Sequence, residues 1–470
     1  MNQTASKLRA PLRASLLPLA LALVLAGCAS PAAIDRSQLP VAPTAFKESA
    51  VTVVAPTAAP QTRGQWWTVF ADPVLDGLIT KANGNNTSIQ VAAARLSQAR
   101  ALAGQVDANR LPQVGIGAGA TRQLNATTGN VAQTVATVGA NLSYEVDLFG
   151  KLSGAANAAT LDATAREALL RSTQLLVQAD VAQTYLSLRA LDTERELVRG
   201  TLLAYQNTLR LTEVRLREGD VAELDVARVR SEVASTESEA LALDQRRAVL
   251  EHALAVLVGE VASNFALVPA AWSTALPAIP AGVPSTVLTR RPDVAAAQNT
   301  MQAAQARVGV AKAAWFPTFA LTANGGYAAP EVQDLFKLST QAWGVGALLS
   351  LPLFDGGRRE AGVQGANADL NIALANYREQ VLVAFRDVED QLVSLRLLSD
   401  QSEAQSRSVA ASSRATVLSG ARYRNGFVSQ LELLDAQRSE LRNRRQALQV
   451  KAAQYAATVG LIRALGGGWA

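Results

Sequence analysis

The stretch RNGFVSQLELLDAQ (residues 424–437) places a glycine turn before a helix-like run that carries two carboxylates three residues apart. Earlier in the chain, REGDVAELDVARVR (residues 217–230) has the same arrangement. The two stretches align at Gly219 and Gly426, with Arg217 and Arg424 before them, at an offset of 426 − 219 = 207 residues. The chain therefore contains an internal duplication, and the fold prediction begins from it.

The duplication extends over most of the chain. Pro112 matches Pro317 at an offset of 317 − 112 = 205 residues, so the two halves differ by a short insertion. We expect a first repeat at residues 85–260 and a second at 290–470. Each repeat is predicted to contain a helix, a strand pair (112–147 and 316–353) and a long helical hairpin that turns near Gly219 or Gly426.

Composition argues against catalysis and nucleic-acid binding. The chain of 470 residues has a single His, the side chain most often used to move protons near neutral pH. That residue, His252, lies within a helical pattern and is predicted to be ordinary helix surface. The net charge of +5 comes from basic and acidic residues interleaved along helices, which is typical of a solvated surface. We expect no enzyme activity, no cofactor, no metal site and no nucleic-acid partner.

The N-terminus has the three regions of a secretory signal. Basic residues precede the short apolar run at residues 16–26, and small residues then lead to Cys28, the single Cys of the chain. This order resembles a bacterial lipobox, which predicts a signal peptide at residues 1–27 and a lipidated Cys28. The alternative is an ordinary signal peptide with Cys28 incidental. A lone Cys excludes an intramolecular disulfide.

Four segments alternate apolar residues with small or polar ones, two in each repeat. This period of two predicts strands with one apolar face, which suits either a membrane β-barrel or a soluble sandwich. Because membrane barrels need about eight strands, four cannot close one alone, and the membrane alternative requires several copies of the chain. The apolar positions are Val114, Ile116, Ala118, Ala120, Ala136, Val138, Ala140, Leu142, Tyr144, Phe319, Leu321, Ala323, Trp343, Val345, Ala347 and Leu349.

Long helices surround these segments. Residues between Gly154 and Gly200, and between Gly365 and Gly420, contain no Gly or Pro. Apolar residues from Val177 to Leu216 recur at steps of three, four or seven, the spacing of a coiled coil. We expect each long helix to pack against neighbours and to return antiparallel at its glycine turn.

Several motifs in order resemble the outer-membrane efflux proteins of the TolC family, in its drug-efflux lipoprotein branch. They are QWWTVFADPVLDGLI (65–79), RRPDV (290–294), LSLPLFDGGRR (349–359) and the opening stretch. The resemblance implies a mixed α+β membrane protein, in which a homotrimer builds one β-barrel from four strands per protomer. A long α-helical coiled-coil barrel continues it through the periplasm. Residues 28–84, the lipidated N-terminal segment, and the Pro-rich linker at 261–289 would form a collar.

The same resemblance assigns a periplasmic gate. Glu432 and Asp435 match two acidic residues that line the constriction, and Tyr423 and Asp225 match partners whose hydrogen bonds between adjacent hairpins hold it shut. The family's basic gate residue is Val428 here, and Arg424 or Arg422 is the expected substitute. Gly219 and Gly426 mark the tips to which an adaptor would dock.

These observations predict a passive exit duct for small toxic compounds in the outer membrane. Its expected partners are a periplasmic adaptor, an inner-membrane efflux transporter and outer-membrane lipid. Two rival interpretations are an adaptor itself and a lipid-anchored coiled-coil scaffold without a pore.

Overall fold

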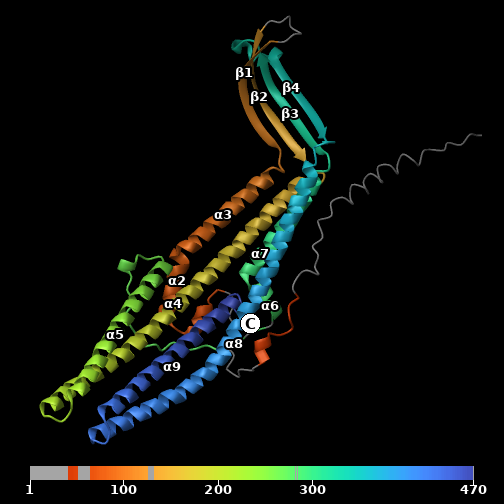
Figure 1. Cartoon of the computed structure of the whole chain (residues 1–470). Coiled ribbons are helices and arrows are strands. Elements are labelled where there is room, and N and C mark those ends of the chain that lie inside the picture. Colours follow the sequence, from red (N-terminus) through yellow and green to blue (C-terminus); the bar gives the residue numbers. More distant parts are fainter. Residues whose placement is uncertain (1–40, 51–63, 125–131, 281, 283, 469–470) are drawn as a thin grey trace, which may run out of the picture. The chain divides into compact units, whose positions relative to one another are not determined.

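The computed structural model describes residues 41–50, 64–124, 132–280, 282 and 284–468 (Figure 1). The predicted signal peptide at 1–27 and Cys28 lie outside these residues. The chain divides into two compact units, and each takes elements from both halves of the sequence. Of the described residues, the strand unit comprises those within Arg95–Arg166 and Ala296–Arg378, and the hairpin unit comprises those within Pro40–Ala94, Glu167–Ala295 and Glu379–Ala470. The predicted repeat boundaries stay a prediction.

The strand unit contains one antiparallel sheet in the order β1-β2-β3-β4. Its strands are β1 (Gln113–Leu124), β2 (Ala132–Val146), β3 (Thr318–Ala329) and β4 (Gln341–Ser350). The central β2–β3 pair joins the two halves of the chain. Short 3₁₀ helices, η6 (Val332–Asp334) and η7 (Leu338–Thr340), lie between β3 and β4.

The register of the sheet aligns the apolar positions of all four strands. Val114 lies opposite Leu142, Leu142 opposite Ala323, and Ala323 opposite Val345. Because side chains alternate between faces along a strand, residues in one such row share a face. The neighbouring row carries Gln113, Ser143, Thr322 and Gly346 on the other face. The sheet thus has one apolar face and one small or polar face.

The helices of the two halves have matching lengths. The first pair, α3 (Thr87–Ala108) and α7 (Pro292–Ala313), has 22 residues each. The long helices α4 (Lys151–Arg217) and α8 (Arg358–Arg424) have 67 residues each, and α5 (Glu223–Leu257) and α9 (Gln430–Ala464) have 35 each. From α4 to α8 and from α5 to α9 the offset is 358 − 151 = 430 − 223 = 207 residues. The long helices also continue through the glycines that bounded the predicted helical stretches.

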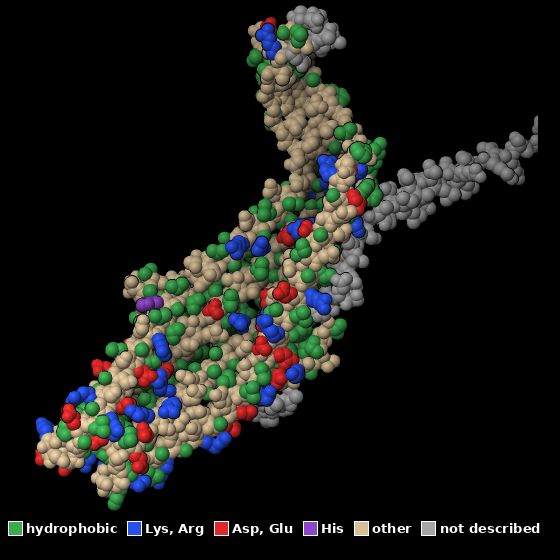
Figure 2. Space-filling view, in the orientation of Figure 1, with side chains coloured by type: hydrophobic (Ala, Val, Ile, Leu, Met, Phe, Trp, Pro, Cys, Tyr) green, Lys and Arg blue, Asp and Glu red, His purple; other side chains and the backbone are tan. Residues whose placement is uncertain are grey.

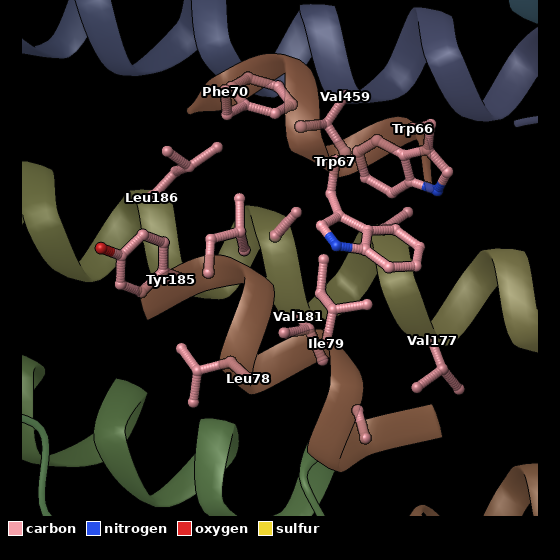
Figure 3. Close-up of a cluster of buried hydrophobic side chains, with 14 of the residues drawn as sticks. Trp66, Trp67, Phe70, Leu78, Ile79, Val177, Val181, Tyr185, Leu186 and Val459 are labelled. Carbon is pink, nitrogen blue, oxygen red and sulfur yellow. The ribbon is translucent and has the colours of Figure 1, made fainter. Parts of the chain in front are cut away.

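The hairpin unit has an aromatic core at one end of its long helices. Asp72 caps α2 (Pro73–Asn85), accepting hydrogen bonds from the backbone N–H groups of Val74 and Leu75, and Pro73 suits the first helical position. Figure 3 shows Trp66, Trp67 and Phe70 of η3 (Trp66–Phe70) turned toward side chains of α2, α4 and α9. The motif at 65–79 therefore anchors the N-terminal segment on the long helices.

Buried charges hold the Pro-rich linker against α4 and α5. Arg189 donates to the carbonyl of Val268 at 2.9 Å, and Glu251 accepts from the backbone N–H of Leu267 at 2.6 Å. Arg247 donates to Asp192 at 2.7 Å. The linker, with η5 (Ala262–Asn264), leads into α6 (Pro284–Arg290).

Hydrogen bonds from the backbone of Lys47 and Glu48 attach the start of the described chain to α8. The carboxylate of Glu389 accepts hydrogen bonds from the backbone N–H groups of Lys47 and Glu48 in η2 (Lys47–Ala50), at 2.7 and 3.1 Å. Glu48 also pairs with Arg396 at 2.8 Å. Lys47 and Glu48 are therefore bound to α8 within the hairpin unit.

Among the described residues, none of the helices combines the length and the apolar character that crossing a membrane requires.

Candidate functional site

Glycine turns form the two hairpin tips of the hairpin unit. Gly219 has φ +81° and Gly426 has φ +77°, in the left-handed region that only glycine adopts without strain. At the first tip the N–H of Asp220 donates to the carbonyl of Arg215 at 2.9 Å. At the second tip the equivalent bond runs from the N–H of Phe427 to the carbonyl of Arg422, also at 2.9 Å. Both long helices thus end in a Schellman-type cap, and the chain reverses.

Charged side chains gather over the tips (Figure 2). Basic residues occupy the last turns of α4 and α8, and acidic residues the first turns of α5 and α9, where each complements the helix dipole. They are Arg215, Arg217, Arg422, Arg424, Glu223, Asp225 and Glu432. The candidate gate is therefore built from oppositely charged helix ends brought together by the turns.

Tyr423 links the two hairpins. Its side chain is buried, at 9% exposed, and its Oη accepts a hydrogen bond from Nη1 of Arg215 at 3.1 Å. The guanidinium also lies over the ring, 5.4 Å from the centroid, within cation–π range. Arg215 was missed by sequence reasoning, although it aligns with Arg422 at the 207-residue offset.

Asp225 lies in the first turn of α5 and is half-buried. Its ion-pair partner within the chain is Arg228, at 3.8 Å. The structure of one chain thus joins Tyr423 to Arg215 and Asp225 to Arg228. The predicted hydrogen bonds of Tyr423 and Asp225 across adjacent hairpins stay a prediction.

The two predicted constriction carboxylates lie on one side of α9, and each has a basic neighbour. Glu432 is 3.6 Å from Arg422, and Asp435 is 3.3 Å from Arg438. Both carboxylates remain open to solvent, with side chains 49% and 61% exposed. Of the two expected substitutes, Arg422 makes the ion pair with Glu432, and Arg424 is exposed at the end of α8.

Arg438 also joins α9 to α5. Its Nε donates to Oε2 of Glu232 at 2.8 Å, and Nη2 contacts the other carboxylate oxygen. Hydrogen bonding to Glu232 raises the pKa of Arg438. A bidentate ion pair of this kind orients the guanidinium. Arg438 was missed because a lone Arg on a helix gives no sequence signal of its partner.

A small apolar cluster joins the two hairpins behind these charges. Tyr205 of α4 is buried with Val229 of α5 and Leu434 of α9, and burial raises the pKa of Tyr205 to about 12. Closer to the tips, Gln430 donates to the hydroxyl of Thr212 at 2.9 Å. Within the described chain, no group of three or more His, Cys, Asp or Glu side chains is arranged to hold a metal ion.

Comparison with known families identifies the fold. The model of the family described as outer membrane efflux protein matches residues 78–260 and 283–467, nearly the whole of both repeats. The chain belongs to the outer membrane efflux protein family. The predicted membership, the mixed α+β fold, the function as an efflux channel and the outer-membrane location are thereby confirmed.

Individual family members resemble the chain over most of its length. The cation efflux system protein CusC of Escherichia coli O6:H1 is 32% identical over 465 residues, covering 97% of this chain and 98% of CusC. The pyoverdine export outer membrane protein OpmQ of Pseudomonas aeruginosa is 34% identical over 416 residues, covering 86% and 87%. The solved structure of the outer-membrane channel OprN matches with a TM-score of 0.87 at 30% identity, covering 94% of this chain and 100% of OprN.

Proposed function

We propose that this efflux protein acts as a passive exit duct, assembled as a homotrimer whose periplasmic end narrows at the hairpin tips. The family provides the efflux role. We add three points from the geometry and the motifs: the trimer, the gate residues and the absence of catalysis.

The observation that carries this proposal is the register of the four-stranded sheet. Its rows collect apolar side chains on one face and small or polar ones on the other, as expected for strands between lipid and a wet lumen. Within the described chain the sheet has two edges, β1 and β4. Unpaired edges are not tolerated in lipid, and pairing β4 of one copy with β1 of the next would satisfy both. Three copies would supply 3 × 4 = 12 strands to one closed sheet.

The charges at the tips support a selective constriction. Three copies would bring six carboxylates, Glu432 and Asp435 from each, around the threefold axis. Rings of carboxylates favour cations in narrow passages. Arg422 and Arg438 partly offset that field, so we expect moderate rather than strict cation preference. The Arg215–Tyr423 contact would hold the two hairpins of each copy in the closed arrangement.

We further propose that a periplasmic adaptor docks near Gly219 and Gly426 and that an inner-membrane transporter supplies the energy. CusC is named for cation efflux and OpmQ for pyoverdine export. For this chain we propose small toxic compounds as cargo, without choosing among them. Acyl chains on Cys28 would add an anchor in the inner leaflet of the outer membrane. Passive exit needs no cofactor.

Extraction and conductance measurements on the full-length protein test the proposal. Membranes are washed with carbonate, the protein is solubilised, and its mobility in mild detergent gels is compared before and after heating. We expect a carbonate-resistant trimer that heating converts to monomer, and discrete conductance steps in planar bilayers. A carbonate-soluble protein without conductance would instead indicate a lipid-anchored scaffold or an adaptor.

A further inference from the structure

The connection between β3 and β4 carries large apolar side chains that one chain leaves exposed. Val332 of η6 is 75% exposed, Phe336 is 74% exposed and Leu338 of η7 is 88% exposed. Turn positions are usually occupied by Gly, Pro and short polar residues, whereas grouped apolar side chains on a surface mark a contact with protein or membrane. We call residues 332–338 the β3–β4 segment.

Backbone hydrogen bonds fold the β3–β4 segment into short turns. The N–H of Leu335 donates to the carbonyl of Val332 at 3.2 Å, and the N–H of Lys337 donates to the carbonyl of Asp334, also at 3.2 Å. After the segment, the hydroxyl of Thr340 donates back to the carbonyl of Lys337 at 2.7 Å. The exposed apolar side chains therefore extend from a segment that has its own hydrogen-bonded structure.

One buried side chain fixes the β3–β4 segment on the sheet. Leu335 is buried in a cluster with Ala136 of β2 and Ala329 of β3, and Tyr327 of β3 packs against this cluster. The ring of Phe336 meets the ring of Tyr327 edge to face, with centroids 5.7 Å apart. The segment is therefore folded back over β2 and β3 instead of extending away from the sheet.

The face that the segment covers is the apolar face of the sheet. Ala136 pairs with Ala329, and Leu142 pairs with Ala323, each six residues further along its strand (142 − 136 = 329 − 323 = 6). Because side chains an even number of residues apart share a face of a strand, Ala136 and Ala329 lie on the same face as Leu142 and Ala323. The segment thus covers the face that we propose for lipid, and not the small or polar face.

The segment lies at the end of the sheet away from the helices. At the opposite end α3 leads into β1, β2 into α4, α7 into β3, and β4 into α8 (Figure 1). In the proposed duct the helices continue into the periplasm, so the segment lies at the outward end. Leu335 and Phe336 contact the central strands β2 and β3, whereas copies would pair at the edge strands β1 and β4. These contacts therefore lie away from the edges that would join neighbouring copies.

We infer that the β3–β4 segment inserts its apolar side chains among the acyl chains of the outer leaflet and anchors the outward end of the sheet. This inference rests on the proposed function, because it takes the apolar face to be the lipid face. The charges of the segment agree with such a position. Lys337 pairs with Asp334, and 62% of its side chain is exposed. Its stem can lie along apolar surface while the ammonium group stays in the headgroup layer.

Nitroxide labels measure the surroundings of the segment in the full-length trimer, reconstituted into vesicles of phosphatidylethanolamine and phosphatidylglycerol. Phe336→Cys and Leu338→Cys carry the label on the segment, and Gln333→Cys is the matched control at an exposed polar position. Val345→Cys reports the apolar face of the sheet itself. Oxygen concentrates among acyl chains and a nickel chelate stays in water, so these two relaxation agents distinguish lipid from solvent. The unsubstituted chain, treated with the same label, gives the signal due to Cys28.

We expect the ratio of oxygen to nickel accessibility at Phe336→Cys and Leu338→Cys to match the ratio at Val345→Cys. It should exceed the ratio at Gln333→Cys severalfold. Because Leu338 is 88% exposed, its substitution removes little packing, and migration as a trimer in mild gels shows that each variant has assembled.

The other outcomes separate this inference from the proposed function. A ratio typical of water at both segment positions, beside a ratio typical of lipid at Val345→Cys, would overturn the anchor and leave the proposed facing of the sheet intact. Low accessibility to both agents would mean that protein covers the segment, and it would also overturn the anchor. A ratio typical of water at Val345→Cys would contradict the proposed facing of the sheet, and the anchor with it.

Discussion

Val345→Arg tests which face of the sheet meets lipid. Val345 is the fifth of the ten residues of β4, so it lies at mid-strand, and it is 77% exposed in one chain. It shares its row with Val114, Leu142 and Ala323, which form the apolar face. An Arg on the lipid face near mid-membrane costs about 2–4 kcal/mol per copy, and three copies multiply that cost to ~6–12 kcal/mol per trimer.

The neighbouring substitution Gly346→Arg is the matched comparison. A Cβ at Gly346 would lie 3.0 Å from the hydroxyl of Thr322, a contact that a small rotation of Thr322 relieves. Its side chain would extend from the polar face, where a charge stays hydrated. Val345→Leu controls for the change of shape without charge.

The assay is the fraction of outer-membrane protein that runs as a heat-modifiable trimer. We expect Val345→Arg to reduce this fraction strongly and Val345→Leu to leave it unchanged. Gly346→Arg should assemble but conduct less in planar bilayers. If Gly346→Arg harms assembly more than Val345→Arg does, the facing of the sheet is inverted.

Three further predictions concern the hairpin unit and the anchor. Asp192→Asn removes a carboxylate whose side chain is 3% exposed, which takes the carboxylate from buried Arg189 and leaves Arg247 with Glu251 alone, so we expect a loss of about 3–5 kcal/mol, measured by thermal unfolding in detergent. Burial raises the pKa of Asp180, opposed by Arg463, so the charged form is disfavoured in the folded state and stability falls as pH rises through that pKa. Asp180→Asn should therefore stabilise the protein at neutral pH, and the gain should vanish as pH falls below the usual 3.8 of an Asp; an equal gain at every pH would refute the burial argument. Cys28→Ser should remove the acyl chains yet leave the trimer in carbonate-washed membranes, because acyl chains are a weak anchor beside a spanning structure, and full release would count against the spanning sheet.

The periodicity and the duplication of the sequence predicted the order of helices and strands, because both can be recognised directly from residue types along the chain. The period of two located the strands, and the glycine pair at Gly219 and Gly426 located the turns, since positive φ strongly selects glycine. The limits of the long helices were less predictable, because a glycine within a packed helix costs only about 1 kcal/mol and does not end it. Gly154 and Gly365 accordingly lie inside α4 and α8.

The sequence indicated candidate gate residues but not their ion-pair partners. The acidic residues Glu432 and Asp435 follow from the motif, whereas the contacts of Glu432 with Arg422 and of Arg438 with Glu232 depend on how two helices pack side by side. Long Arg side chains reach several partners, so the sequence does not single one out. The Arg215–Tyr423 contact was missed for the same reason, because its members lie 208 residues apart.

Ion selectivity of the purified trimer in planar bilayers tests the central claim most directly. The variant Glu432→Ala with Asp435→Ala removes up to six carboxylates from the proposed constriction, while Asp400→Ala with Glu403→Ala removes an equally spaced exposed pair from α8. The account predicts that the first variant conducts with reduced cation selectivity and weaker block by multivalent cations, and that the second resembles the wild type. A folded Glu432→Ala, Asp435→Ala trimer with unaltered selectivity would contradict a gate at the hairpin tips.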